Sequence, residues 1–181
     1  GAQDTLSVGT QLANAVSAGN TNEVARLLEA NRTLVNTLVN ELSGQTLLHL
    51  AVEGRGDLAG DLAMTRLLLR YGADVNTRDR RGYQALHIAA SKVRYEHTNL
   101  VALLLEAKAD INAPGERGHT PLHVATQAAG PKMLEFLLAR GADTNARNSK
   151  DETPLDLAVR LRRADVEKVL RLHGAKDSLD P

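Results

Sequence analysis

The stretch Gly118-His119-Thr120-Pro121-Leu122-His123-Val124-Ala125 decides the fold of this chain, because close copies of it recur along the sequence. The other copies are residues 44–51, 82–89 and 151–158. A pair of leucines and then an Ala-Asp-x-Asn turn come after each of the first three of the four copies, and Gly174-Ala175 closes the last one. Two linked landmarks that recur at a nearly fixed period predict a stack of similar structural units.

The apolar residues between the two landmarks follow the period of an α-helix. Met133, Leu134, Leu137 and Leu138 share one helical face, and Gly141 then offers the left-handed conformation at which helices commonly stop. Each unit is therefore predicted to hold two short helices and a turn. Because one helix pair cannot bury its own apolar face, neighbouring units must stack.

These landmarks resemble the ankyrin repeat, and the resemblance covers residues 11–178. It implies an all-α repeat solenoid, a stack of helix-turn-helix units joined by short hairpin loops. We expect one domain with these units: a capping repeat at 11–42, repeats at 43–80, 81–116 and 117–149, and a second capping repeat at 150–178. We expect residues 1–10 to form a flexible segment and residues 179–181 a tail.

A few residues depart from the repeated pattern. Leu47 and Ala85 stand where the third copy has the proline that starts its first helix, and Gln84 replaces the threonine. Lys108 replaces the glycine that ends the second helix, which costs about 1 kcal/mol in a left-handed conformation. Arg171 takes the place of a leucine, as expected of a polar end to the stack.

The composition excludes several classes of protein. Lys plus Arg and Asp plus Glu both number 22, so the whole chain has no net charge with which to attract nucleic acid or an anionic membrane. The absence of cysteine excludes disulfides, thiol nucleophiles and thiolate zinc sites. No apolar run approaches the ~20 residues that cross a bilayer. We expect a monomer of the cytoplasm or nucleus, with export as the alternative.

The recurring polar residues are interpreted as structural. His49, His87 and His123 stand one per unit, and neighbouring units lie about 10 Å apart, far beyond the reach of one shared zinc ion. The resemblance implies that these histidines join backbone groups of successive repeats. The Asp and Asn residues of the turns are expected to bond to nearby backbone groups. They are Asp74, Asn76, Asp110, Asn112, Asp143 and Asn145.

The resemblance also implies a binding surface, since ankyrin partners are held by the hairpin tips and the exposed side of the first helix of each repeat. The variable positions there give the predicted partner-binding residues. They are Arg80, Arg81, Tyr83, Lys92, Glu116, Arg117, His119, Gln127, Lys150, Glu152 and Arg160. With Glu53 included, six cations face three glutamates on this surface. We therefore expect a protein partner with an acidic or mixed-charge face, the alternative being that these are solvated surface arginines.

The spacing between copies predicts a second contact region. Successive copies begin at residues 44, 82, 118 and 151, so the first two units are longer than the ~33 residues typical of the repeat. The extra residues fall between the two helices of those units, around residues 54–62 and 92–98. Insertions there either bind a second partner or are tolerated surface variation. The candidate residues are Arg55, Asp57, Arg94, Tyr95 and His97.

No phosphate-binding loop, nucleophile elbow or metal-ligand motif occurs in the sequence. We therefore predict a non-catalytic protein–protein interaction module, an adaptor, scaffold or inhibitor, that needs no cofactor or metal. The alternative is an accessory or targeting domain of a larger enzyme, a channel or a microbial effector, because the chain does not begin with methionine.

Overall fold

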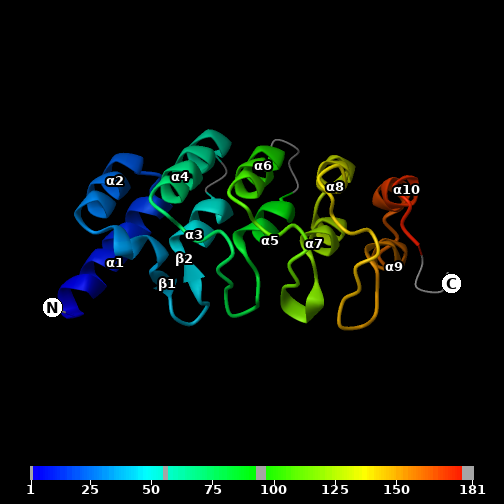
Figure 1. Ribbon diagram of the computed structural model, residues 1–181, viewed down its shortest axis with the longest axis horizontal. Helices are drawn as coiled ribbons and strands as arrows, with labels where there is room; N and C mark the ends of the chain where they lie inside the picture. The colour runs from blue at the N-terminus through cyan, green and yellow to red at the C-terminus, as the bar shows by residue number, and fades with distance from the viewer. Residues whose placement is uncertain (1, 55–56, 93–96, 177–181) are drawn as a thin grey trace.

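The computed structural model describes residues 2–54, 57–92 and 97–176 of the chain. It consists of helix pairs stacked side by side, with the first and last helices at opposite ends of the stack (Figure 1). The helices are α1 (Ala2–Ser17), α2 (Thr21–Ala30), α3 (Leu47–Glu53), α4 (Leu58–Arg70), α5 (Ala85–Ala90), α6 (Thr98–Glu106), α7 (Pro121–Ala128), α8 (Pro131–Leu138), α9 (Pro154–Arg160) and α10 (Ala164–Leu172). The predicted all-α repeat solenoid is confirmed.

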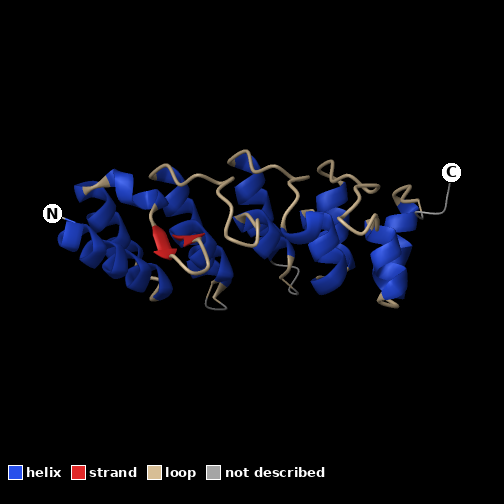
Figure 2. Cartoon of the chain, turned by 90° about the horizontal axis from the view of Figure 1, so that it is seen from below, coloured by secondary structure: helices blue, strands red, loops and turns tan. Residues whose placement is uncertain are grey.

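The helices form two rows. The odd-numbered helices contact one another in sequence order from α1 to α9, and the even-numbered helices form the second row (Figure 1). Hairpin loops extend from the row of odd-numbered helices; we call them fingers. Finger 1 spans residues 38–46, finger 2 spans 77–84, finger 3 spans 113–120 and finger 4 spans 146–153. They follow one another along one side of the stack (Figure 2).

The repeated sequence explains why each odd-numbered helix begins where it does. The Thr120 hydroxyl accepts a hydrogen bond from the backbone N–H of His123, and Pro121 occupies the first helical position, where a missing N–H is harmless. Helices α3 and α5 begin in the same register although Leu47 and Ala85 replace the proline. The capping residue and its partner three positions later therefore suffice to start the helix.

The core is a repeated layer of leucines. One leucine from each odd-numbered helix after α1 is at most 2% exposed, and the set is Leu48, Leu86, Leu122 and Leu155. The first leucine of each predicted pair, or its equivalent, is completely buried in the even-numbered row; these are Leu68, Leu104, Leu137 and Leu170. Each unit thus covers the apolar face of its neighbour, because a single helix pair cannot bury its own apolar face.

The ends of the even-numbered helices use the left-handed conformation, as the sequence predicts. Gly72, Gly141 and Gly174 have positive φ angles of 93°, 89° and 78°. Lys108 occupies the same position with φ of 70°, a conformation that side chains with a Cβ atom adopt at an energetic cost. Its strain therefore lies in the turn between α6 and finger 3.

The N-terminal boundary differs from our expectation. Residues 2–10, which we expected to form a separate segment, continue helix α1, so there is no boundary at residue 11. Val8 is half-buried against the core, and Leu12, Ala15 and Val16 follow it at helical spacing. Because this apolar face packs on the next repeat, the helix is longer than the signature alone suggested.

The last helix, α10, carries two charged residues where the preceding repeat has leucines. In the alignment of units, Glu167 and Arg171 take the places that Leu134 and Leu138 hold one repeat earlier. The two side chains form an ion pair at 3.0 Å on helix α10. Burying such a pair against another repeat would remove its water and is therefore costly.

The extra residues of the first full repeat differ from the predicted loop. Helix α4 begins at Leu58 and has 13 residues, compared with 8 in α8, so much of the insertion lengthens a helix. A second feature that was not predicted is a small antiparallel pairing in finger 1 between β1 (Leu38–Asn40) and β2 (Gln45–Thr46).

Candidate functional site

Three histidines join successive repeats, as the resemblance implied. The Nε2 atom of His49 lies 3.0 Å from the backbone carbonyl oxygen of Tyr83 in the next repeat. His123 makes the equivalent contact with the carbonyl oxygen of Glu152 at 3.1 Å, whereas His87 contacts the carbonyl oxygen of Ala113, at the start of finger 3, at 2.9 Å. Each histidine therefore fixes the base of the following finger.

The hydrogen bonds also define the protonation of these rings. In His123, Nδ1 accepts a hydrogen bond from the backbone N–H of Thr120 at 3.2 Å, so the proton of the neutral ring lies on Nε2. Burial lowers the pKa of His123, and it lowers the pKa of completely buried His87 to about 4. Neutral imidazoles with both nitrogens occupied hold the structure together and have no spare atom for chemistry.

The asparagines of the turns form a second ladder, and here our expectation of purely local bonds was wrong. Asn76 Oδ1 accepts from the backbone N–H of Asp110 at 3.1 Å in the next repeat. Asn112 does the same with Asp143 at 2.8 Å, and the ladder starts one repeat earlier at Asn36. The aspartates do bond locally, since each accepts from the asparagine two residues later. The side-chain amide is long enough to reach the neighbouring turn, which sequence spacing does not reveal.

The fingers extend from the same side of the row of helices α3, α5, α7 and α9 (Figure 1). We call the fingers, together with the exposed sides of these four helices, the finger face. All of the predicted partner-binding residues belong to these elements or directly follow them. Arg80 and Arg81 lie on finger 2, Glu116 and Arg117 on finger 3, and Lys150 on finger 4. Tyr83, His119 and Glu152 stand at the same register, where each finger returns to its helix; Gln127 and Arg160 lie on or at the end of helices, and Lys92 follows α5.

A compact cluster occupies the middle of the finger face. The guanidinium of Arg81 lies 4.8 Å from the centre of the Tyr83 ring and pairs with the Glu116 carboxylate of the next finger at 2.8 Å. Tyr83 in turn stacks on His87, with ring centres 5.1 Å apart. The neighbouring Arg81 lowers the pKa of Glu116. This arrangement holds an exposed arginine over an aromatic ring that is itself supported by a buried histidine.

A second cluster lies one repeat further along. His119 stacks on His123 with ring centres 5.5 Å apart, and Asn148 lies 3.1 Å from its Nε2 atom. Glu152 accepts from Asn148 at 3.0 Å and from Arg160 at 2.8 Å, and these bonds lower its pKa. Two of the predicted cations, Arg81 and Arg160, are thus already paired within the protein.

Asn148 is a residue that the sequence analysis missed at this site. It is 7% exposed, and its Oδ1 atom also accepts from the backbone of Lys150 at 2.8 Å and of Glu152 at 3.0 Å. Asp79 has the same register in finger 2 and accepts from the backbone N–H groups of Arg81 and Tyr83. Asp79 and Asn148 each stand three residues before the residue that turns their finger, and this shared position could have identified Asn148 from the sequence.

The predicted insertion site is only partly described. Arg55, Arg94 and Tyr95 lie outside the described residues. Asp57 is exposed directly before helix α4, whereas His97 is only 8% exposed. The buried side chain of His97 therefore does not fit our expectation of a contact residue.

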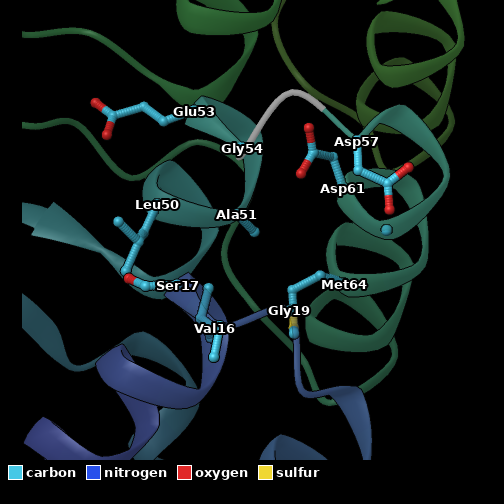
Figure 3. A pocket seen from close by; sticks show the side chains of 12 residues that line it. Val16, Ser17, Gly19, Leu50, Ala51, Glu53, Gly54, Asp57, Asp61 and Met64 are labelled. Carbon is cyan, nitrogen blue, oxygen red and sulfur yellow. The ribbon is translucent and has the colours of Figure 1, made fainter.

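A pocket of about 430 Å³ lies beside this region, between the end of α1, the end of α3 and the start of α4 (Figure 3). Val16, Ala51 and Met64 line its apolar part, and Asp57 and Asp61 contribute carboxylates. Figure 3 shows the Glu53 carboxylate pointing away from these two. Within the described residues, no three histidine or carboxylate side chains are placed to hold a metal ion. None of the helices in the described ranges is long and apolar enough to cross a membrane.

Comparison with known proteins places the chain in a family. The model of ankyrin repeats in three copies matches residues 12–114, 58–148 and 93–179. Notch-regulated ankyrin repeat-containing protein A of Danio rerio is 42% identical over 78 residues, which are 42% of this chain and 64% of that protein. The human Notch-regulated ankyrin repeat-containing protein is 42% identical over 78 residues, 42% of this chain and 63% of its own length.

A relative with a different name is protein phosphatase 1 regulatory subunit 27 of Mus musculus, 37% identical over 76 residues. That match covers 42% of this chain and 45% of the mouse protein. The chain therefore spans less than two thirds of the length of each of these relatives. The family match extends over nearly the whole stack of helix pairs, from the first capping helix to the last. The chain belongs to the ankyrin-repeat family.

Proposed function

We propose that this protein is a non-catalytic interaction module that binds a partner protein on its finger face. Ankyrin repeats are protein-interaction modules. The observation that carries the proposal is the cluster of Arg81, Tyr83 and Glu116. Arginine and tyrosine are the residue types that dominate binding energy at interfaces, and a side chain already held in place loses little entropy when a partner arrives.

Charge supports a partner with an acidic or mixed-charge face. The predicted partner-binding residues, taken together with Glu53, include six cations and three glutamates, in a chain with equal numbers of both signs. Such a local excess directs a negatively charged surface toward the fingers and accelerates association. The paired cations Arg81 and Arg160 contribute less to this attraction than the others, because their carboxylate partners already neutralise them.

Capture from an extract of the native source tests the proposal, with the unaltered chain compared with an Arg80→Glu/Arg81→Glu double variant. We expect the variant to lose at least tenfold in affinity for a true partner, since it reverses two charges beside Tyr83. The matched control is Arg66→Glu/Lys168→Glu, which makes the same charge change on the exposed even-numbered helices. Equal capture by both variants and the parent would contradict binding through the fingers.

One comparison favours a second candidate, in which the partner is an enzyme that this chain regulates or directs to a target. The mouse relative is named as a regulatory subunit of a protein phosphatase. The same capture experiment separates the two candidates when the bound fraction is identified by mass spectrometry. An enzyme among proteins that depend on Arg80 and Arg81 supports the second candidate, whereas non-enzymatic partners support a scaffold or inhibitor.

We further propose that the protein is monomeric, acts in the cytoplasm or nucleus, and binds its partner without nucleic acid. The charged pair of Glu167 and Arg171 on the terminal face supports the monomer. Sedimentation equilibrium of the purified chain measures its mass in solution, and a fluorescent fusion in cells of the source organism shows its location. Capture that persists after nuclease treatment would show that nucleic acid is not the bridge.

A further inference from the structure

One cation from each of three successive fingers stands at the same register. Arg81, Arg117 and Lys150 each precede the residue that turns the finger, and the turning residues Gly82, Gly118 and Asp151 have positive φ angles of 76°, 72° and 62°. The three residues therefore share one register, although Arg117 itself also has a positive φ of 55°, so the backbone of finger 3 differs locally from that of fingers 2 and 4. We call this row the cation stripe.

The cation stripe is available to a ligand. All three residues are exposed, and the side chains of Arg117 and Lys150 form no ion pair or hydrogen bond within the parts of the chain that the structure describes. Arg81 shares its guanidinium with Glu116, which also feels the positive charge of Arg117. Glu116 thus occupies, from within the protein, a position that a partner carboxylate could take.

The distance between fingers follows from the packing of the helices beneath them. Helices α5, α7 and α9 contact one another in order, and packed helices stand about 8–10 Å apart. Backbone hydrogen bonds also connect neighbouring fingers, from Ser149 N–H to the Arg117 carbonyl at 2.8 Å and from Arg80 N–H to the Ser43 carbonyl at 2.9 Å. The backbone positions that carry the stripe therefore repeat at intervals of roughly 10 Å.

A polyproline II segment matches this interval. It rises about 3.1 Å per residue with three residues per turn, so every third side chain lies on the same face, about 9 Å from the last. An α-helix docks mainly through an apolar face, but the exposed large apolar residues of the described chain include none between Tyr83 and Lys150.

We propose that the cation stripe of Arg81, Arg117 and Lys150 binds an extended, polyproline II-like segment of a partner protein that carries a carboxylate at every third residue. This inference rests on the proposed function, and it specifies the chemistry and spacing of the partner. Each cation takes one carboxylate, and Glu116 competes for the one nearest Arg81. Because the ligand is already extended before it binds, it loses little conformational entropy.

Two synthetic peptides of identical composition test the spacing. The first consists of four Glu-Pro-Pro units, and the second holds the same residues with its four glutamates consecutive. We expect the full chain to bind the first peptide more tightly in fluorescence anisotropy at low ionic strength. Equal affinity for both would overturn the proposal by showing that charge alone matters, and so would tighter binding of the second peptide or no binding of either.

Three variants test the residues. Arg117→Gln and Lys150→Gln should each lower the affinity for the first, spaced peptide (four Glu-Pro-Pro units) by about two- to fivefold, as expected for exposed ion pairs. Glu116→Gln should raise the affinity for the spaced peptide by a similar factor, since the substitution frees Arg81 and removes a competing charge. The matched control Arg66→Gln lies on α4 and should leave the affinity unchanged. If the three variants and the control all changed the affinity for the spaced peptide in the same way, the assignment of binding to the cation stripe would be overturned.

The outcome is separable from that of the proposed function. A chain that captures a native protein through Arg80 and Arg81 but ignores the spaced peptide has a functional finger face and a different kind of partner. A chain that binds the spaced peptide through Arg117 and Lys150 but captures nothing from its native source has the stripe without support for the wider proposal.

Discussion

His49 donates a hydrogen bond from Nε2 to the backbone carbonyl of Tyr83, 3.0 Å away in the next repeat. The residue that it fixes is the aromatic centre of the finger face, on which the Arg81 guanidinium lies. Repeat packing and the proposed binding surface therefore share this bond. The stack does not merely carry the site, because its internal bonds set the position of the side chains that we expect to meet a partner.

The buried imidazole of His87 makes stability depend on pH. Its pKa is lowered from 6.5 to about 4 in the folded protein, so the neutral ring is favoured on folding. This contribution is complete above pH 6.5 and is lost as the pH falls from 6.5 to about 4, with a full size of about 3 kcal/mol.

The variant His87→Gln should be less stable than the parent near neutral pH, and its urea midpoint should fall less between pH 6.5 and pH 4. Carboxylates titrate in both proteins, so the difference between the two curves isolates the histidine. Parallel curves for the parent and the variant over this range would contradict the prediction.

The asparagine ladder should contribute measurable stability. Asn112→Ala removes the bond to the Asp143 N–H at 2.8 Å and a longer one to the Gly141 carbonyl at 3.4 Å. We expect a loss of about 1 kcal/mol in the free energy of unfolding by urea, a typical value for such bonds. Asn99→Ala on the exposed side of α6 is the matched control and should change stability by a few tenths of a kcal/mol at most.

Lys108 is predicted to be a site where stability can be gained. With φ at 70°, its side chain holds a conformation that glycine adopts without penalty. Lys108→Gly should therefore raise the thermal midpoint, with a gain of about 0.5–1 kcal/mol. The same substitution in the interior of α10, Lys168→Gly, should lower the midpoint, because glycine is unfavourable in a helix. A fall in both variants would show that Lys108 is not strained.

Charge on the terminal face should keep the stack from growing. Glu167→Leu/Arg171→Leu restores the residues found one repeat earlier and exposes an apolar surface that fits another stack. We expect this variant to self-associate in sedimentation velocity experiments, whereas Glu106→Leu/Lys168→Leu, which also replaces one acidic and one basic residue by leucine, should remain unchanged in mass. A double variant at Glu167 and Arg171 that stays monomeric would show that other features close the end.

Local chemistry explains how well the sequence predicted the fold. The capping group of Thr120, Pro121 and His123 starts a helix wherever it occurs, and a leucine such as Leu137 must be buried for the helix to pack. Deviations from the repeat pattern could also be predicted when their effect was local, as at Lys108. The start of α1 was not readable, because residues 2–10 carry no repeat signature and their helix depends on packing against the next unit.

The sequence by itself determined the repeat, its helix pairs, the register of the histidines and the positions that we propose face a partner. All of these follow from patterns that act within one unit or recur between units. Only the tertiary structure decided that Arg81 lies on Tyr83 and pairs with Glu116, that Asn148 supports His119, and that the buried side chain of His97 is withdrawn from the surface. The contacts of Arg81 with Glu116 and of Asn148 with His119 join residues of different repeats, and their distances depend on how one repeat packs on the next, which no single unit encodes.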